Sequence, residues 1–162
     1  MVSLALTALL AAVVAGVGCD DPEANKVDGS KSAQEKPNAP GNSFLNQLDQ
    51  VQYQKAKKEF ASTGTAILSV AYDNKLSPRT LQLIHAASEK TFDKIVLFIH
   101  NNGGPAEHYV AMYADMGNPD FSRRVKQQYS DVLNFMQLYD APIKSYTEDF
   151  TKEAFAIAEK GR

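Results

Sequence analysis

The chain has 162 residues, of which 44% are hydrophobic and 22% charged, and its formal net charge is -2. That length suits one domain with appendages, and the composition is ordinary for a globular protein. The small negative charge, without a basic cluster, gives no electrostatic reason to expect nucleic-acid binding. Cys19 is the only cysteine, so an intrachain disulfide and a thiolate-rich metal site are excluded.

An apolar run opens the chain and has the anatomy of a secretory signal peptide over residues 1–18. From Val2 to Gly18 nearly every residue is apolar. The run is too short for a comfortable membrane span, and it ends in small residues. No Lys or Arg precedes it, so either the amino terminus alone supplies the positive charge or translation begins further upstream.

The end of this run, Gly16–Cys19, resembles the lipobox of bacterial lipoproteins. In that family the cysteine is lipidated and becomes the new N-terminus. The resemblance therefore implies a lipid anchor at Cys19 and localisation to the cell envelope, on a membrane facing the periplasm or the exterior. Gly16 stands where the family usually has leucine, and Asp20 implies inner-membrane retention in enteric-type bacteria. The alternative is an ordinary signal peptide with a chance cysteine.

Residues 19–42 have the composition of a disordered tether, because they contain almost no large apolar residue and many Pro, Gly, Ser, Asp and Lys residues. A single domain is expected over residues 43–162. Its first element is a helix that Asn42 or Ser43 caps and that runs to about Ser62.

The middle of the chain predicts a βαβ unit. Residues 64–72 and 95–99 are apolar runs that predict strands, and residues 77–90 predict a helix that starts at Ser77-Pro78. Two such strands are parallel, with a right-handed crossover. The predicted fold class is α/β, with a parallel sheet built from βαβ units, an N-terminal helix and a helical C-terminal segment. Further helices are expected at 105–116, 120–138 and 147–160, and a short strand at 141–146.

The stretch that follows the second predicted strand is the candidate binding site. It consists of His100, Asn101, Asn102, Gly103 and Gly104, and a proline comes next, which suits the first position of a helix. Two glycines permit a turn at positive φ and a close approach of another group. The N–H groups at the helix start would face that group. We therefore predict a binding pocket of backbone groups beside His100.

The order of parts from Gly64 to Met116 resembles the Clp protease proteolytic subunit and the related crotonases. In that superfamily a strand, a helix and an apolar strand lead into an Asn-Ser-Pro-Gly-Gly-like turn and then a helix; here residues 100–105 form the turn. The segment Ala141-Pro142-Ile143 also resembles the start of the next strand in that family. The resemblance implies that Gly103 and Gly104 supply backbone N–H donors to an oxyanion.

The nucleophilic serine of that superfamily has no match in this chain. Its expected place falls on or near Glu153, where Thr151 is the nearest hydroxyl. The histidine and aspartate of the family lie beyond Arg162. The resemblance therefore implies the fold and a backbone pocket, and it argues against serine-protease chemistry.

The spacing of the other candidate residues gives little support to a metal site, a phosphate-binding loop or a serine nucleophile. His100, His108 and Asp115 were considered as metal ligands, but no His-Glu-x-x-His or similar spacing is present. The glycine turn is not a phosphate loop, because no Gly-Lys-Ser/Thr follows it. Ser69 and Ser145 lack a nucleophile-elbow pattern. No metal and no cofactor are expected.

These features predict a membrane-anchored envelope lipoprotein that acts as a non-catalytic binding or assembly module, in a setting such as conjugation or surface exclusion. A protein or peptide partner is expected, and a homo-oligomer stays open. The alternative is a periplasmic hydrolase of Clp-protease-like fold that uses His100 and the Gly103 and Gly104 amides, or a truncated copy of one. A Ser, Thr or Asp nucleophile within reach of His100 would favour the hydrolase.

Overall fold

The computed structural model describes residues 40–161. The predicted signal peptide, Cys19 and all but the end of the predicted tether therefore lie outside the described residues. Seven helices make up the described part: α2 (Pro40–Gln47), α3 (Gln50–Ala71), α4 (Pro78–Asn101), α5 (Ala106–Asp115), α6 (Phe121–Gln128), α7 (Ser130–Leu138) and α8 (Asp140–Lys160). None of residues 40–161 lies in a strand, so the predicted α/β class with a Clp-protease-like or crotonase-like sheet is wrong. The fold is all-α.

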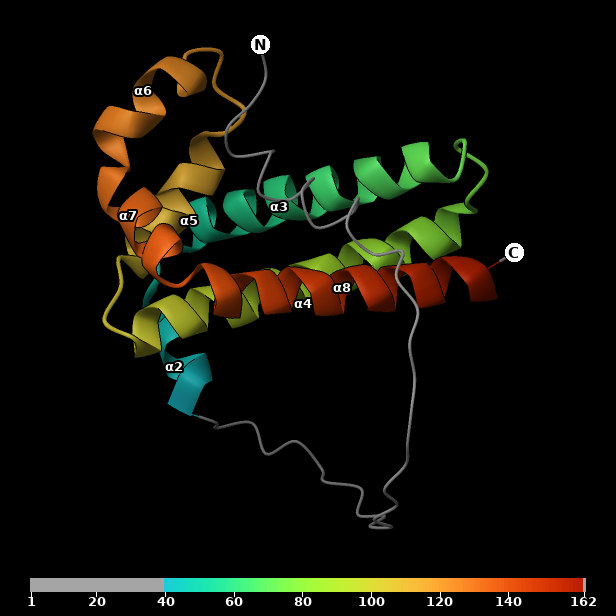
Figure 1. Cartoon of the computed structure of the whole chain (residues 1–162), viewed down its shortest axis with the longest axis horizontal. Helices are drawn as coiled ribbons and strands as arrows, with labels where there is room; N and C mark the ends of the chain where they lie inside the picture. Colours follow the sequence, from blue (N-terminus) through green and yellow to red (C-terminus); the bar gives the residue numbers. More distant parts are fainter. Residues whose placement is uncertain (1–39, 162) are drawn as a thin grey trace.

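The longest helices, α3, α4 and α8, lie lengthwise beside one another, and α5, α6 and α7 gather at one end of them (Figure 1). Helix α4 is the centre of the arrangement, because it packs against α2, α3, α5 and α8. Helices α3 and α4 form an antiparallel pair joined by a short turn, in which Asp73 and Asn74 have positive φ values. None of the helices in residues 40–161 is long and apolar enough to cross a membrane.

Both strands of the predicted βαβ unit, residues 64–72 and 95–99, lie in long helices, apart from the C-cap residue Tyr72. The buried residues Tyr53, Ala56, Phe60, Gly64 and Leu68 of α3 recur every three or four positions. That spacing runs through the segment predicted as the first strand, so one apolar face of a helix accounts for both parts. The nine residues predicted as the first strand are too few to reveal this helical spacing.

The second predicted strand, residues 95–99, forms the end of α4. Its five consecutive apolar residues were interpreted as a buried strand, but this end of α4 is covered by several other helices. A helix that is enclosed on most sides also carries a continuous apolar run. The run alone therefore does not distinguish the two structures.

The residues at which helices begin and end were predicted more accurately than the fold class. Ser77 caps α4, where its side chain accepts a hydrogen bond from the Thr80 N–H at 3.1 Å, and Pro78 is the first helical residue. The helix predicted at 105–116 is confirmed as α5, and the one at 120–138 is split at Tyr129 into α6 and α7. The predicted strand at 141–146 is wrong. It lies in α8, whose first turn accommodates Pro142 because N–H groups there have no helical partner.

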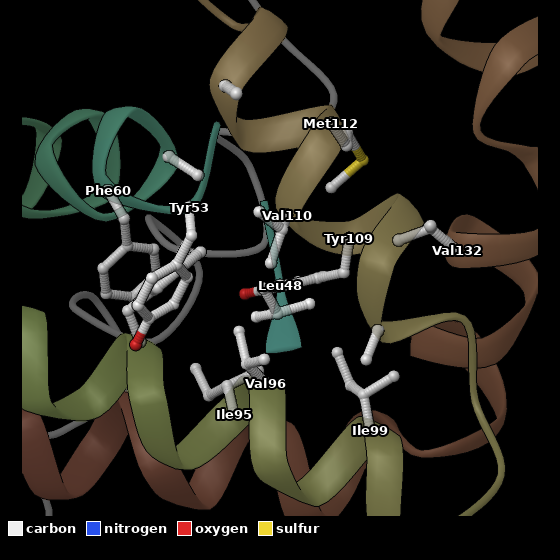
Figure 2. Packing of buried hydrophobic residues seen from close by; sticks show 14 of the residues in the cluster. Leu48, Tyr53, Phe60, Ile95, Val96, Ile99, Tyr109, Val110, Met112 and Val132 are labelled. Carbon is white, nitrogen blue, oxygen red and sulfur yellow. The ribbon is translucent and has the colours of Figure 1, made fainter. Parts of the chain in front are cut away.

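The buried apolar residues form two clusters. The major core lies where α2, α5, α6 and α7 meet α3 and α4, and Figure 2 shows much of it. The minor core lies between α3, α4 and α8 and has only six buried members: Leu68, Ile84, Ala87, Phe150, Ala154 and Ala158. The members of the major core are Leu48, Tyr53, Ala56, Phe60, Phe92, Ile95, Val96, Ile99, Ala106, Tyr109, Val110, Met112, Ala114, Phe121 and Val132.

Candidate functional site

The predicted glycine turn is the C-terminal end of α4. His100 and Asn101 are the last two helical residues, Asn102 is the C-cap, and Gly103 has the predicted positive φ, at 70°. The Gly103 N–H donates to the carbonyl of His100 at 3.0 Å, and the Gly104 N–H donates to that of Ile99 at 2.8 Å. Both N–H groups therefore satisfy carbonyls at the helix end. They are occupied in this arrangement and do not form a free pair of oxyanion donors.

Gly104 is needed at its position for a packing reason. A Cβ atom on Gly104 would lie 2.5 Å from a ring carbon of Phe135 on α7. That separation is far below ordinary contact distance, so any larger residue would displace the ring. Close approach was predicted for the glycine pair, and the approaching group is an aromatic side chain of the same chain.

The three side chains considered as metal ligands do not meet. The exposed ring of His100 stacks on Phe44 of α2, with 3.6 Å between ring centroids. His108 Nδ1 lies 2.6 Å from a carboxylate oxygen of Asp131, and Asp115 pairs with Arg124 at 3.0 Å. Within residues 40–161 no group of three His, Cys, Asp or Glu side chains is arranged to hold a metal ion.

A different feature, which the sequence did not suggest, is an apolar groove between α3 and α8. Its floor contains Ser88 of α4, and it encloses a space of about 50 Å³. The opening is flanked by Phe155, whose side chain is 36% exposed. The remaining lining residues are Phe60, Gly64, Ile67, Leu68 and Ala71 of α3, and Thr147, Phe150 and Thr151 of α8.

Gly64, which lines the groove, allows α3 to lie close to α4 and α8. A Cβ atom there would lie 3.2 Å from Ser88 Oγ and 3.3 Å from the ring of Phe150. Glycine in a helix interior costs about 1 kcal/mol relative to alanine. This close approach is the structural reason for its presence. A glycine inside a helical period was the one sequence signal that could have located the groove.

The three hydroxyl groups among the lining residues of the groove differ in their hydrogen bonding. Thr147 Oγ1 donates to the Lys144 carbonyl at 2.8 Å, and Thr151 Oγ1 donates to the Thr147 carbonyl at 2.8 Å. Both hydroxyl protons are therefore used within α8. Ser88 is 0% exposed, and its hydroxyl has no hydrogen-bond partner in the structure.

One end of the groove is closed by contacts between the ends of α3 and α8. The rings of Tyr72 and Phe155 lie 5.9 Å apart, and the Tyr72 hydroxyl donates to a Glu159 carboxylate oxygen at 3.0 Å. This bridge holds the C-terminal parts of the two helices together. The bridge therefore fixes the two helices that form the walls of the groove relative to each other.

The clearest electrostatic effects belong to the major core, away from the groove. Burial raises the pKa of Tyr53, and the hydrogen bond that its hydroxyl donates to Asp93 raises it further. Lys57 pairs with the same carboxylate at 2.8 Å. Burial also raises the pKa of Tyr109, with a further contribution from the neighbouring Tyr113. These phenols are neutral at physiological pH, and their packing and bonds are those of structural residues.

Comparison with known proteins gives no relative: no protein-family model matches the chain, and no curated protein or solved structure is significantly similar to it.

Proposed function

We propose that this protein is a lipid-anchored module of the cell envelope that binds a protein partner and has no catalytic activity of its own. The α3–α8 groove carries this proposal. It combines a mostly apolar lining with an opening to solvent beside Phe155. Concave, mostly apolar surfaces are common binding sites, and the enclosed space of about 50 Å³ suits part of a side chain of a partner.

The geometry around His100 supports binding over hydrolysis. In a hydrolase the ring of His100 would be expected to lie near a nucleophile, but here it stacks on Phe44. The Gly103 and Gly104 N–H groups are occupied by carbonyls of α4. A catalytic base and an oxyanion site would both require this region to rearrange.

The proposed anchor places the groove near a membrane surface. Twenty residues separate Cys19 from α2, and a chain of that length spans at most about 70 Å when extended. The domain could therefore meet partners embedded in the membrane or located close to it. Its function would then depend on two separate parts, the Cys19 anchor and the groove.

Membrane fractionation tests the anchor. Cys19→Ser should release the protein from membranes, because the lipid attachment point is lost. Unchanged membrane association of that variant would contradict lipidation at Cys19.

Affinity capture from the cells that make the protein tests the groove. Ala71 lines the groove and is exposed, whereas Ala66 is exposed on the same helix but does not line it. Ala71→Trp should fill the groove and remove the captured partner, and Ala66→Trp should retain it. Equal capture by both variants would exclude the groove as the binding site.

A further inference from the structure

The glycine turn at the end of α4 contains a pair of residues with a chemistry of its own. Asn102 is followed by Gly103, and no other asparagine of the chain precedes a glycine. The side-chain amide carbon of an asparagine is an electrophile, and the next backbone nitrogen can attack it to close a five-membered ring. Glycine hinders this attack least, because it has no Cβ atom. Asn102 is therefore the least hindered site for this reaction in the chain.

Both residues of the pair are accessible. Asn102 and Gly103 are exposed, and apart from the chain neighbours no atom of the described residues lies within 4 Å of a Cβ atom built on Gly103. No neighbouring side chain therefore shields this face of the turn. Water, which must open the ring after it has closed, reaches the same face.

The folded helix end holds the two reacting groups apart. Asn102 has a ψ of 16°, which turns the Gly103 nitrogen away from the asparagine side chain, whereas ring closure needs both on the same side of the Cα–C bond. The Asn102 side-chain amide donates to the Phe98 carbonyl at 2.8 Å. The Gly103 N–H donates to the His100 carbonyl at 3.0 Å. Both bonds must open before the ring can close, and helix ends open more readily than helix centres.

We propose that Asn102 is a site of spontaneous deamidation, that opening of the α4 C-terminus sets its rate, and that its product weakens this helix end. In the first step the Gly103 nitrogen bonds to the side-chain carbonyl carbon and gives up its proton, and the side-chain nitrogen leaves as ammonia. Water then adds to one of the two carbonyls of this succinimide. The products are aspartate, or isoaspartate with the backbone running through the side chain. One water is consumed, one ammonia is released, and no oxidant is needed.

Either product changes the end of α4 in two ways. The amide group that donates to the Phe98 carbonyl is lost. A carboxylate takes its place beside the last carbonyls of the helix, where the helix dipole is negative, and this arrangement is unfavourable. Gly104 comes two residues later and lies against the Phe135 ring of α7. Deamidation is therefore an irreversible change at the point where α4 meets α7, and it depends neither on the groove nor on the anchor.

Peptide mass spectrometry of the aged full chain tests the site. The chain with Cys19→Ser is incubated at physiological pH and temperature, in buffer and in guanidinium chloride, until well after the denatured sample has reacted completely. The peptide that contains Asn102 should gain one dalton and include isoaspartate. In buffer its reaction should be about thirtyfold slower than in denaturant, which is the effect of two net hydrogen bonds that must first open.

Asn74 is the matched control in the same sample, because it is exposed in the turn between α3 and α4 but precedes Lys75. It should keep its mass in buffer. In denaturant, where the helix end is absent, Gly103→Ala should slow the reaction at Asn102 severalfold, because the new methyl group hinders the attack. An Asn102 peptide that keeps its mass in buffer would overturn the proposal, as would equal rates in the two solvents or an equal reaction at Asn74.

Hydrogen exchange tests the effect of the product on the helix end. Anion exchange separates the modified chain, because it has one more negative charge. The Gly104 amide, which donates to the Ile99 carbonyl at 2.8 Å, should exchange about fivefold faster in the modified chain, which is the effect of one lost hydrogen bond. Equal exchange in the two forms would overturn the proposed weakening.

Discussion

The two cores of this protein differ in how completely they are closed. All seven helices of residues 40–161 contribute side chains in or against the major core, and it contains interlocking rings, among them Phe60, Phe92, Tyr109 and Tyr113, whose neighbouring centroids lie 4.9 to 5.7 Å apart. The minor core has only three helices around it, and half of its six buried members are alanines. Large side chains close one end of the bundle, and small ones leave a groove at the other.

The hydrogen bonding of buried polar groups also differs between the two cores. At the major core, the Tyr53 hydroxyl and the Lys57 ammonium share the carboxylate of Asp93. At the minor core, the Ser88 hydroxyl has no partner. Packing is therefore tighter at the major core, and the fully buried Ser88 hydroxyl at the minor core lacks a hydrogen bond. The minor core leaves accessible apolar surface in the groove, which is the physical basis of the proposed binding site.

The largest effect that separates the two ends should come from truncating a phenylalanine. Phe92 is 0% exposed and contacts four aromatic rings of the major core. Phe92→Ala should lower the free energy of unfolding by about 3–5 kcal/mol, because it removes buried area and leaves a cavity. Urea unfolding followed by circular dichroism measures this change.

Phe155→Ala is the matched control at the open end. Phe155 is 36% exposed and touches Tyr72 at the edge of the groove. Its truncation should cost about 1 kcal/mol or less, since little buried area is lost. Equal losses for the two variants would mean that the minor core is as tightly packed as the major one.

Alkaline pH should weaken the major core selectively. Burial raises the pKa of Tyr53 and Tyr109 above the ordinary value of 10.0. Below pH 10 both the folded and the unfolded chain keep these protons, so the stability contribution is complete. Above pH 10 the unfolded chain releases them while the folded chain retains them, so stability falls by up to about 1.4 kcal/mol per pH unit for each phenol.

Unfolding measured from pH 8 to 12 checks this dependence. Tyr109→Phe should reduce the slope above pH 10 by up to one proton, because one of the phenols with a raised pKa is then absent. Tyr139→Phe is a suitable comparison, since Tyr139 is only partly buried at the end of α7. A slope that Tyr139→Phe reduces as much as Tyr109→Phe does would contradict a specific role for the buried phenol.

The sequence predicted local features of this fold better than its class. The Ser77-Pro78 start was predicted correctly, and α5 lies within one residue of the predicted bounds at each end, with Pro105 as N-cap rather than first helical residue. Gly103 has the positive φ that the glycine pair permits. All of these features depend on a few neighbouring residues. The choice between strand and helix at residues 64–72 and 95–99 depends on what covers each segment. Short apolar runs do not contain that information.

The groove was missed for a related reason. Its ten lining residues come from three helices, and α8 is far from α3 and α4 in the sequence, so no local spacing reveals them. Gly64 was interpreted as the start of a strand, whereas it is the point where α3 approaches Ser88 and Phe150. The expected lipid anchor at Cys19 lies outside the described residues and stays a prediction.

The glycine turn provides a smaller test of the closed end. Gly104→Ala should destabilise the protein by about 1–3 kcal/mol, because the new methyl group would press on the ring of Phe135. Gly103→Ala separates this from a backbone effect. Gly103 has a φ of 70° and no atom within 4 Å of a built Cβ, so its substitution should cost about 1 kcal/mol from conformation alone.

A second substitution distinguishes the two causes in the same experiment. Phe135→Leu makes room beside residue 104 and should recover part of the loss in Gly104→Ala, but none of the loss in Gly103→Ala. Thermal unfolding of the single and double variants measures this coupling. Purely additive losses in both pairs would show that the Phe135 ring is not what requires glycine at position 104.

The smallest effect should have opposite signs for two hydroxyls of α4. Thr91 Oγ1 is buried and donates to the Ala87 carbonyl at 3.1 Å, so Thr91→Val should lower the free energy of unfolding by about 1 kcal/mol. Ser88 is equally buried but has no partner, so Ser88→Ala should raise it by up to about 1 kcal/mol, because an unfavourable buried group is removed. If Ser88→Ala instead destabilises the protein, a bound water or another internal group already satisfies the hydroxyl. A stabilising Ser88→Ala substitution would show that the unpaired hydroxyl lowers the stability of the minor core, in contrast to the paired hydroxyl of Thr91.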